Sequence, residues 1–229
     1  MRKEQADLEW RDEAIPVSTR FDDPYFSLDN GLAETRHVFL AGNDLPARFA
    51  PGFHIAELGF GTGLNLLTVW KAWEEAGMDS PLRFTSFEAF PMRADEMARA
   101  LAAFPEVAPY AARLVAAYAE DPRLRSLEGI SAEVVIGDAR ETLPQQSFAA
   151  DAWFLDGFSP AKNPELWNAA LMAQVGRHTR AGGTAATYTA AGFVRRGLEA
   201  AGFDVTRVPG FGRKRHMTRC TMPSDMPSP

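Results

Sequence analysis

Residues 53 to 65 decide the fold of this chain, and they read Phe53-His54-Ile55-Ala56-Glu57-Leu58-Gly59-Phe60-Gly61-Thr62-Gly63-Leu64-Asn65. A short apolar run is followed by an acidic residue and then by three glycines at alternate positions. Glycine has no Cβ, so it permits positive φ and lets a ligand approach the backbone closely. Because Thr62 to Trp70 resume as a mostly apolar helix, we expect a strand that turns sharply into a helix.

The glycine spacing argues against a dinucleotide site. Leu64 stands where the dinucleotide fingerprint has its third glycine. Glu57, at the end of the strand, would repel a phosphate, but it could bind the cationic amino-acid part of S-adenosylmethionine. The alternative is a tight turn that binds no ligand.

Acidic residues follow three later strands. These strands are expected at residues 82–88, 132–136 and 151–155. Because the carboxyl ends of parallel strands meet at one edge of a sheet, Glu88, Asp138 and Asp156 should lie near Glu57. In such a site Glu88 could accept the ribose hydroxyls of a nucleoside, and Asp138 could accept a hydrogen bond from an adenine amino group. A Gly-Asp turn is also common as a helix cap, which is the alternative for Asp138.

Alternating strands and helices predict an α/β fold, with a doubly wound and mostly parallel sheet covered by helices on both faces. Further strands are expected at 183–189, 203–208 and 216–222, and helices at 62–76, 91–104, 105–119, 165–176 and 190–201. We divide the chain into an N-terminal arm or lid (1–50), a core (51–222) and a disordered tail (223–229). Within the arm, residues 1–24 are expected to be irregular, and a helix over 32–40 is expected to be closed by Gly42 and Asn43.

The charge is distributed unevenly. The 229 residues carry 24 Lys and Arg against 30 Asp and Glu, a net charge of −6, which excludes a globally basic nucleic-acid binder. Between Arg177 and Arg219, however, nine basic residues face two acidic ones, a local charge of +7. A polyanion could therefore dock on the C-terminal part, although such clusters are also found simply solvated.

Metal and membrane sites are not predicted. Cys220 is the single cysteine, which excludes an intrachain disulfide and a cysteine metal cluster, and the four histidines show no metal-ligand spacing. Met1 to Asp7 lack the apolar core of a signal peptide, and no apolar run approaches about 18 residues. We therefore expect a soluble, cytoplasmic protein.

A polar loop follows the strand at 151–155, where this fold places a second substrate. It reads Asp156-Gly157-Phe158-Ser159-Pro160-Ala161-Lys162-Asn163-Pro164. The loop thus combines an acid, an aromatic ring, a lysine and an asparagine with two prolines, Pro160 and Pro164, which restrict its backbone.

The acids and glycines together resemble the class I S-adenosylmethionine-dependent methyltransferases. This resemblance implies a Rossmann-like, doubly wound sheet that is mostly parallel and has an antiparallel last strand. Finer segments, over roughly residues 15 to 220, resemble the methyltransferase domain of the MnmC/MnmD family. These segments are Phe21-Asp22-Asp23, Tyr25-Phe26-Ser27, Asp29 to Leu32, Glu34-Thr35-Arg36, Val38-Phe39, Glu57 to Asn65, Ser86-Phe87-Glu88, Trp153 to Pro164 and Gly210 to Arg215.

This resemblance implies methyl transfer from S-adenosylmethionine to the amine of 5-aminomethyl-2-thiouridine at wobble position 34 of tRNA. It implies that Glu88 binds the cofactor's ribose and Asp138 its adenine. The other implied cofactor residues are Glu57, Gly59, Phe60, Gly61, Thr62, Gly63, Asn65, Ala139, Asn30 and Thr35. Two-domain members of the family continue into a flavin-dependent oxidase. This chain stops before such a domain, so we expect no oxidase activity, only a functional link to a separate wobble-uridine oxidase.

Asp156 is the expected catalytic residue, which would hold the acceptor ammonium, orient it and accept or relay its proton. Its alternative role is to cap the following loop. Phe158 could stack on a flipped-out uracil, and Lys162 could meet a phosphate, with Ser159 and Asn163 completing the substrate loop. The anticodon stem-loop would be contacted through its backbone by Arg213, Lys214 and Arg215.

Three alternatives remain open from the sequence. A small-molecule amine N-methyltransferase would keep the cofactor residues without needing the basic segment. A polyamine synthase of related fold would use decarboxylated cofactor. A non-catalytic tRNA-binding module would bind tRNA independently of Asp156.

Overall fold

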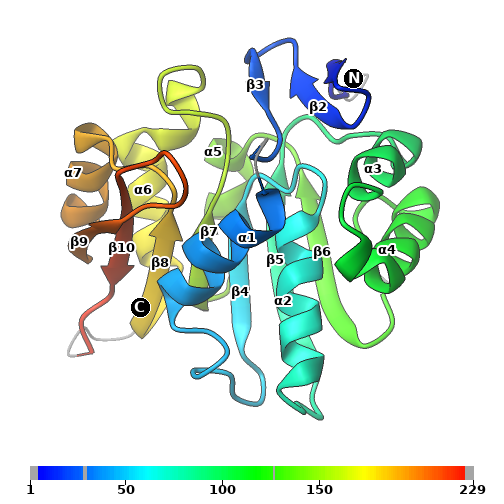
Figure 1. The fold of residues 1–229 in the computed structure, drawn as a ribbon. Helices are drawn as coiled ribbons and strands as arrows, with labels where there is room; N and C mark the ends of the chain where they lie inside the picture. The colour runs from blue at the N-terminus through cyan, green and yellow to red at the C-terminus, as the bar shows by residue number, and fades with distance from the viewer. Residues whose placement is uncertain (1–4, 28–29, 126, 225–229) are drawn as a thin grey trace.

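The computed structural model describes residues 5–27, 30–125 and 127–224 (Figure 1). Its centre is a seven-stranded sheet of order β6-β5-β4-β7-β8-β10-β9. The strands are β4 (His54–Leu58), β5 (Leu82–Glu88), β6 (Ile130–Ile136), β7 (Ala150–Leu155), β8 (Thr179–Thr187), β9 (Asp204–Pro209) and β10 (His216–Thr221). Strands β4 to β8 pair in parallel, and β10 is antiparallel to both β8 and β9. The predicted fold class is therefore confirmed, including its antiparallel last strand.

Strand β4 lies at the middle of the sheet between β5 and β7. All five of its residues are buried, as a parallel strand covered on both faces requires. Its register sets Glu57 opposite Ser86 of β5 and Phe154 of β7. The end of β4, where the glycine turn starts, is thus fixed by both neighbours.

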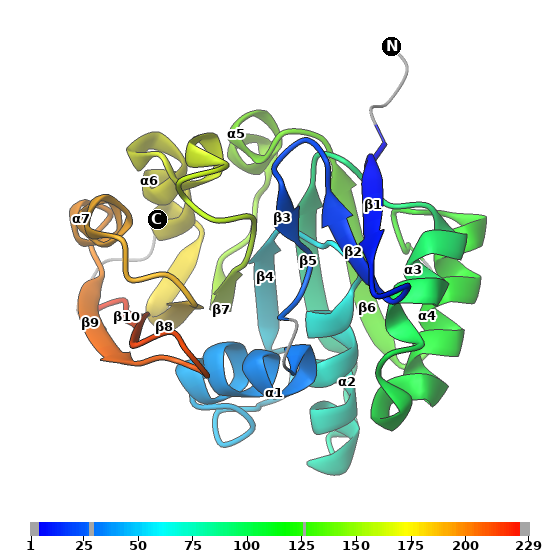
Figure 2. The ribbon, with the colours of Figure 1, turned by 45° about the horizontal axis from the view of Figure 1, so that its top comes forward.

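Helices cover both faces of the sheet (Figure 2). One face packs against α2 (Leu64–Glu75), α3 (Ala94–Leu101) and α4 (Ala108–Glu120), through side chains such as Trp70 and Leu114. The other packs against α5 (Ala139–Thr142), α6 (Ala169–Arg177) and α7 (Gly192–Ala200), through side chains such as Leu171 and Leu198. Short 3-10 turns complete the set: η3 (Pro105–Val107), η4 (Leu143–Gln145) and η5 (Pro164–Trp167).

The first residues form a small sheet, and the prediction that 1–24 are irregular is wrong for residues 8–24. The strands β1 (Leu8–Arg11), β2 (Ile15–Ser18) and β3 (Asp23–Pro24) pair antiparallel. They are only two to four residues long, and the turn between β1 and β2 places Asp12 and Glu13 at positive φ without a glycine, so the usual sequence signals are missing. This N-terminal sheet lies over the carboxyl ends of β4 and β5 (Figures 1 and 2).

The arm helix is longer than expected. It begins as α1 (Gly31–Thr35), with the Asn30 side chain accepting a 2.9 Å hydrogen bond from Ala33 N. It continues as a π-helix, η1 (Arg36–Leu40), and a 3-10 turn, η2 (Ala41–Asn43), so Gly42 and Asn43 belong to the helix rather than closing it. A Cβ on Gly42 would lie 2.7 Å from Ala186 Cβ, which shows that glycine is needed here for close packing on β8 rather than for chain reversal.

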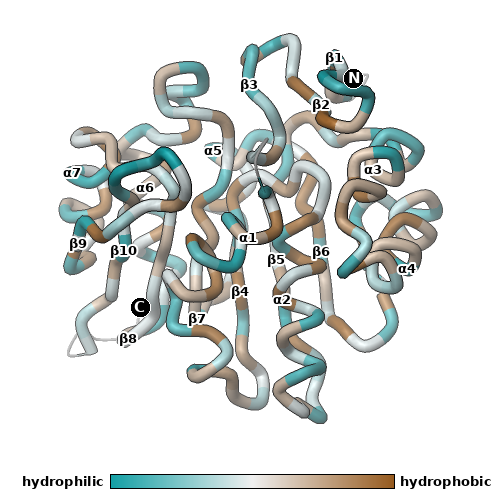
Figure 3. The backbone as a smooth tube through the Cα atoms, viewed as in Figure 1, coloured by the Kyte–Doolittle hydropathy of each residue, from teal (hydrophilic) through white to brown (hydrophobic). Residues whose placement is uncertain are grey.

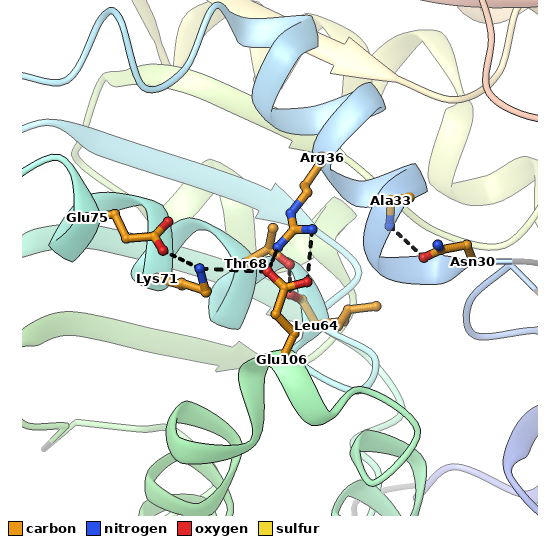
Figure 4. Close-up of polar contacts among 8 residues, drawn as sticks. All are labelled: Asn30, Ala33, Arg36, Leu64, Thr68, Lys71, Glu75 and Glu106. Atoms are coloured by element: carbon orange, nitrogen blue, oxygen red, sulfur yellow. Dashed lines mark hydrogen bonds and ion pairs between the residues drawn. The ribbon is translucent and has the colours of Figure 1, made fainter.

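Ion pairs connect this arm to η3 and α2 (Figure 4). The Arg36 guanidinium donates to both carboxylate oxygens of Glu106 in η3. Lys71 of α2 lies 3.7 Å from the same carboxylate and also pairs with Glu75. The side chains of Val38 and Phe39 are buried in the core cluster, so the arm packs on the core by apolar contacts as well.

Other boundaries differ by a few residues. Strand β8 begins at Thr179 rather than 183, and the helix expected at 165–176 is split between η5 and α6. Of the predicted disordered tail, residues 225–229 lie outside the described residues. No helix in the described part of the chain is both long and apolar enough to span a bilayer.

Candidate active site

The glycine turn brings the ends of β4 and β7 into contact. Gly59, Gly61 and Gly63 all have left-handed backbone conformations, with φ of 89°, 53° and 77°. A Cβ on Gly59 would lie 2.2 Å from the backbone oxygen of Asp156, a separation that real atoms do not reach. The turn therefore requires glycine here, both for its φ and for its closeness to Asp156.

Asn65 links the buried Glu57 carboxyl group to the partly buried Asp156 carboxyl group. Its Nδ2 donates to Glu57 Oε1 and to Asp156 Oδ2, each at 2.8 Å. Thr35 Oγ1 donates to Asn65 Oδ1 at 2.9 Å, which fixes the orientation of the amide. Ser86 Oγ donates to the other oxygen of Glu57 at 2.5 Å. The arm, the glycine-turn helix and the carboxyl-end regions of three strands, β4, β5 and β7, thus share one hydrogen-bond network.

Glu57 lies behind the cavity wall rather than on it. It is 1% exposed, and burial raises its pKa well above the usual value. Since Asn65 and Ser86 already occupy its two oxygens, the Glu57 side chain acts on the site through Asn65.

Asp156 has a pKa raised to about 7. Burial is the main cause, and the nearby Glu34 carboxylate adds to it, whereas the hydrogen bond from Asn65 and the Lys214 ammonium lower it. A carboxyl group with such a pKa changes its protonation state near neutral pH, which suits a group that accepts a proton during a reaction.

Glu88 and Asp138 lie where the strand-end rule placed them. Glu88 accepts hydrogen bonds from Gly61 N at 2.9 Å and Phe90 N at 2.8 Å. Asp138 accepts from Arg140 N at 2.9 Å, caps α5 and pairs with the Arg140 guanidinium, which lowers its pKa. Its side chain has the capping geometry and also lines the cavity, so the two alternatives for Asp138 are compatible.

A cavity of about 1050 Å³ lies at this edge of the sheet. The predicted site residues that line it are Thr35, Gly59, Phe60, Gly61, Thr62, Asn65, Glu88, Asp138, Ala139, Asp156, Phe158, Ser159, Asn163 and Lys214. Those that do not are Asn30, Glu57, Gly63, Lys162, Arg213 and Arg215.

The cavity lining is acidic. Its carboxyl groups are those of Asp23, Glu34, Glu88, Asp138, Glu141, Asp156 and Glu165, and its basic groups are those of Arg20, Arg140 and Lys214. Such an excess of carboxyl groups favours a cationic ligand.

The N-terminal sheet and its connections cover the loop after β7. Phe158 stacks on Phe21 at 4.8 Å and meets Tyr25 edge-on at 5.0 Å between ring centroids. Asp23 Oδ2 accepts a 2.8 Å hydrogen bond from Ser159 N, and Lys162 pairs with Asp22 at 3.0 Å. These contacts occupy the two side chains that we expected to meet the uracil and a phosphate.

Glu34 and Tyr188 are site residues that the sequence reasoning missed. Lys214 Nζ lies 2.7 Å from Glu34 Oε1 and 4.0 Å from the centroid of the Tyr188 ring. Tyr188 follows β8, so the strand-end rule would have found it had it not been applied to acids alone. Glu34 is separated by 122 residues from Asp156, and no local signal indicates that the two meet.

Arg213 and Arg215 are exposed on either side of Lys214, in the hydrophilic connection between β9 and β10 (Figure 3). Within the described ranges, no group of three or more His, Cys, Asp or Glu side chains is placed to hold a metal ion.

Comparison with known proteins identifies the family. Residues 105–223, more than half of the chain, match a family model described as S-adenosyl-L-methionine-dependent methyltransferase. The chain belongs to the S-adenosyl-L-methionine-dependent methyltransferases. The sheet described above is the core of that fold.

Among the relatives of this methyltransferase is the tRNA 5-methylaminomethyl-2-thiouridine biosynthesis bifunctional protein MnmC of Ectopseudomonas mendocina (strain ymp). It is 51% identical over 223 residues, which cover 93% of this chain and 34% of the relative. The chain thus spans about a third of the length of that relative, and the predicted resemblance to the methyltransferase part of MnmC is confirmed.

Comparison with solved structures agrees with this family and this fold. MnmC2 from Aquifex aeolicus superposes with a TM-score of 0.73 at 26% identity, over all of this chain and 73% of that one. Spermidine synthase from Thermotoga maritima has a TM-score of 0.55 at 13% identity, over 97% of this chain and 73% of that one, and so shares the fold.

The residues present fit the cofactor of this family. Gly59 and Gly61 line the cavity at positive φ, so backbone rather than side chains forms this part of its wall. The acidic lining suits S-adenosylmethionine, which carries a sulfonium and an ammonium.

Proposed function

We propose that the chain transfers a methyl group from S-adenosylmethionine to the amine of 5-aminomethyl-2-thiouridine at wobble position 34 of tRNA. The observation that carries this proposal is Asp156, a partly buried carboxyl group with a pKa raised to about 7 in an acidic cavity. The name of the relative that is 51% identical supports the choice of tRNA as the substrate.

The cofactor would lie along the glycine turn. When bound, S-adenosylmethionine would supply an electrophilic methyl group, whose bond to sulfur breaks as the bond to the acceptor nitrogen forms, with S-adenosylhomocysteine as the leaving group. Glu88 would bind the ribose and Asp138 the adenine, each keeping its backbone hydrogen bonds. Thr35 and Asn65 would hold Glu57 and Asp156 at fixed positions beside the methionine part.

Asp156 would receive the acceptor amine. The amine of the substrate is mostly an ammonium at pH 7, and its nitrogen must lose a proton before it can attack. The Asp156 carboxylate would bind the ammonium, orient the nitrogen and take the proton at Oδ1, because Oδ2 already accepts a hydrogen bond from Asn65.

The tRNA would contact the exposed rim. Arg213 and Arg215 would meet the backbone of the anticodon stem-loop. Phe158 would stack on the extruded uracil and Lys162 would meet a phosphate, so the contacts with Phe21 and Asp22 would have to give way. Ser159 and Asn163 complete this substrate loop. Action in the cytoplasm, in sequence with a separate oxidase, belongs to the same proposal.

A transfer assay tests the substrate. Labelled S-adenosylmethionine is incubated with tRNA carrying the aminomethyl group, with the same tRNA carrying an unmodified wobble uridine, and with simple primary amines. Label on the aminomethyl tRNA alone is the expected result.

A small-molecule amine N-methyltransferase is the second candidate, because the acidic cavity suits an amine whether or not it is attached to tRNA. Label on the simple amines that bulk tRNA does not suppress would establish this candidate and contradict the first.

A further inference from the structure

The Lys214 ammonium is held in the way proteins hold a cationic ligand. It lies 2.7 Å from Glu34 Oε1 and 4.0 Å from the centroid of the Tyr188 ring. A carboxylate combined with an aromatic face is a common receptor for an alkyl ammonium. Glu34, Tyr188, Lys214 and Asp156 all line the same cavity. The chain's own cation therefore fills a cation site next to the catalytic carboxyl.

The walls of this site are fixed by contacts that do not involve Lys214. The Tyr188 hydroxyl donates to Gly157 O at 2.7 Å, and Trp167 packs against the ring edge. The Glu34 side chain is 14% exposed on α1, a helix whose continuation is fastened by Arg36 and Glu106 (Figure 4). Asp156 is held by Asn65. These walls would keep their places if Lys214 left.

The Lys214 side chain is positioned so that it can leave this cation site. Its side chain is 46% exposed and comes from the connection between β9 and β10, between the exposed Arg213 and Arg215. An alkyl ammonium on a flexible stem is easily replaced by another of the same charge.

We infer that Glu34, Tyr188 and Asp156 form a receptor for a primary ammonium group on the acceptor, and that the Lys214 side chain occupies this receptor until the acceptor arrives. The inference rests on the proposed function, because it requires an amine acceptor. One ammonium replaces another, so the charge of the receptor stays balanced. Glu34 and Tyr188 then hold the nitrogen while Asp156 takes its proton.

The exchange also explains why an amine on a polyanion would be favoured. Once displaced, Lys214 moves to the rim beside Arg213 and Arg215, where tRNA phosphates can neutralise it. A free amine offers no such partner to the displaced lysine. The receptor therefore selects an ammonium, and the lysine adds a preference for one carried by nucleic acid.

Nucleoside binding tests the receptor directly. The probes are 5-aminomethyluridine, which is cationic, and 5-hydroxymethyluridine, which is neutral, each titrated into the full chain and followed by NMR. Glu34→Gln should weaken binding of the cationic nucleoside about tenfold and leave the neutral one unchanged, because it removes one charge-assisted contact. Lys214→Met should strengthen binding of the cationic nucleoside about threefold to tenfold, because it removes the internal competitor.

Matched variants separate the receptor from the stability of the arm. Glu106→Gln breaks the Arg36 ion pair on the same arm without touching the cavity, and it should leave both affinities within about twofold. Lys214→Arg keeps the charge. Its affinity for the cationic nucleoside should therefore be much closer to that of the unchanged protein than the affinity of Lys214→Met is. Affinity for S-adenosylmethionine checks that each variant is folded.

Weaker binding of the cationic nucleoside to Lys214→Met would overturn the inference, as would an equal effect of Glu34→Gln on both nucleosides. If Glu34→Gln does not fold, the affinity of Lys214→Met for the cationic nucleoside tests the inference on its own. Methyl transfer to aminomethyl tRNA by the unchanged protein is scored separately. Transfer without these affinity changes contradicts the receptor alone, and the affinity changes without transfer contradict the proposed function alone.

Discussion

At Asp156 the proposed activity and the stability of the fold oppose each other. Its pKa is about 7 in the folded protein against a usual value of 3.8, chiefly because it is buried. Ionising it therefore costs free energy in the folded state but not in the unfolded chain. This cost is absent below pH 3.8, grows as the pH rises and is complete above pH 7.

Replacing Asp156 by asparagine should consequently stabilise the protein at high pH. We expect Asp156→Asn to raise the free energy of unfolding by about 1–3 kcal/mol at pH 8 and to change it little near pH 4. Denaturant unfolding at the two pH values measures the difference. A loss of stability at pH 8 would contradict the assigned protonation behaviour.

The same carboxyl group should control the acidic limb of the pH–rate profile. The groups that act on it are Asn65, Glu34, Lys214 and Glu57. If the carboxylate is the active form, kcat/KM rises with pH through an apparent pKa near 7. Glu34→Gln should move this limb to lower pH, because the Glu34 charge raises the pKa of Asp156. An unmoved limb in that variant would show that another group controls it.

Among individual residues, the acidic residues at strand ends were predicted well from the sequence. Acids at the ends of parallel strands meet at one edge of the sheet, and Glu88, Asp138 and Asp156 do line one cavity. The partners of Phe158 and Lys162 could not be predicted, because Phe21 and Asp22 are more than 130 residues away. Local patterns carry no information about contacts at that separation.

Among the elements, the glycine turn tolerates least change. A Cβ on Gly59 would collide with the Asp156 backbone at 2.2 Å, whereas Gly52 has a similar φ of 76° and nothing within 4 Å. Gly59→Ala should therefore cost more than about 2 kcal/mol of stability and abolish cofactor binding, and Gly52→Ala should cost only about 1 kcal/mol. Thermal unfolding and calorimetric titration with S-adenosylmethionine measure both. If Gly59→Ala and Gly52→Ala had equal effects on stability and cofactor binding, the close contact between Gly59 and Asp156 could not be the cause of the loss in Gly59→Ala.

The N-terminal sheet is held over the site by the loop after β7. Phe158→Ala removes the ring contacts with Phe21 and Tyr25, each worth about 0.5–1.5 kcal/mol. We expect limited proteolysis within residues 5–27 to become at least about threefold faster. Phe193→Ala on α7 changes an exposed ring and serves as the control. Unchanged proteolysis in Phe158→Ala would show that other contacts hold the sheet in place.

Long elements were predictable and short ones were not. The strands β4 and β7 at the centre of the sheet are mostly apolar, and each has an acidic residue at or just after its carboxyl end. β1 to β3 are only two to four residues long, too short for a hydrophobic pattern to mark them as strands. The assignment of residues 1–50 as a lid stays a prediction.

In the molecule as a whole, acidic side chains line the cavity, and basic side chains are exposed on one surface connection. The net charge is −6 and the cavity lining is acidic, whereas Arg213 and Arg215 stand exposed on the β9–β10 connection. This distribution suits a cationic group inside and a polyanion outside.

The double variant Arg213→Ala/Arg215→Ala should weaken tRNA binding uniformly across tRNA sequences, and the slope of log affinity against log salt should fall by about 2. Affinity for S-adenosylmethionine should not change. Filter binding over a range of salt concentrations measures the slope. An unchanged slope would mean that the tRNA backbone lies elsewhere.

The measurement that tests the central claim most directly is nucleoside mass analysis of the wobble position after reaction. Aminomethyl tRNA and S-adenosylmethionine are incubated with the unchanged protein or with Asp156→Asn, and the digested tRNA is examined for a gain of one methyl group on the aminomethyl nucleoside. We predict that gain with the unchanged protein and at least a hundredfold slower gain with Asp156→Asn, roughly the contribution of a positioned proton acceptor. A methyl group on any other nucleoside, or an undiminished rate in the variant, would contradict the account.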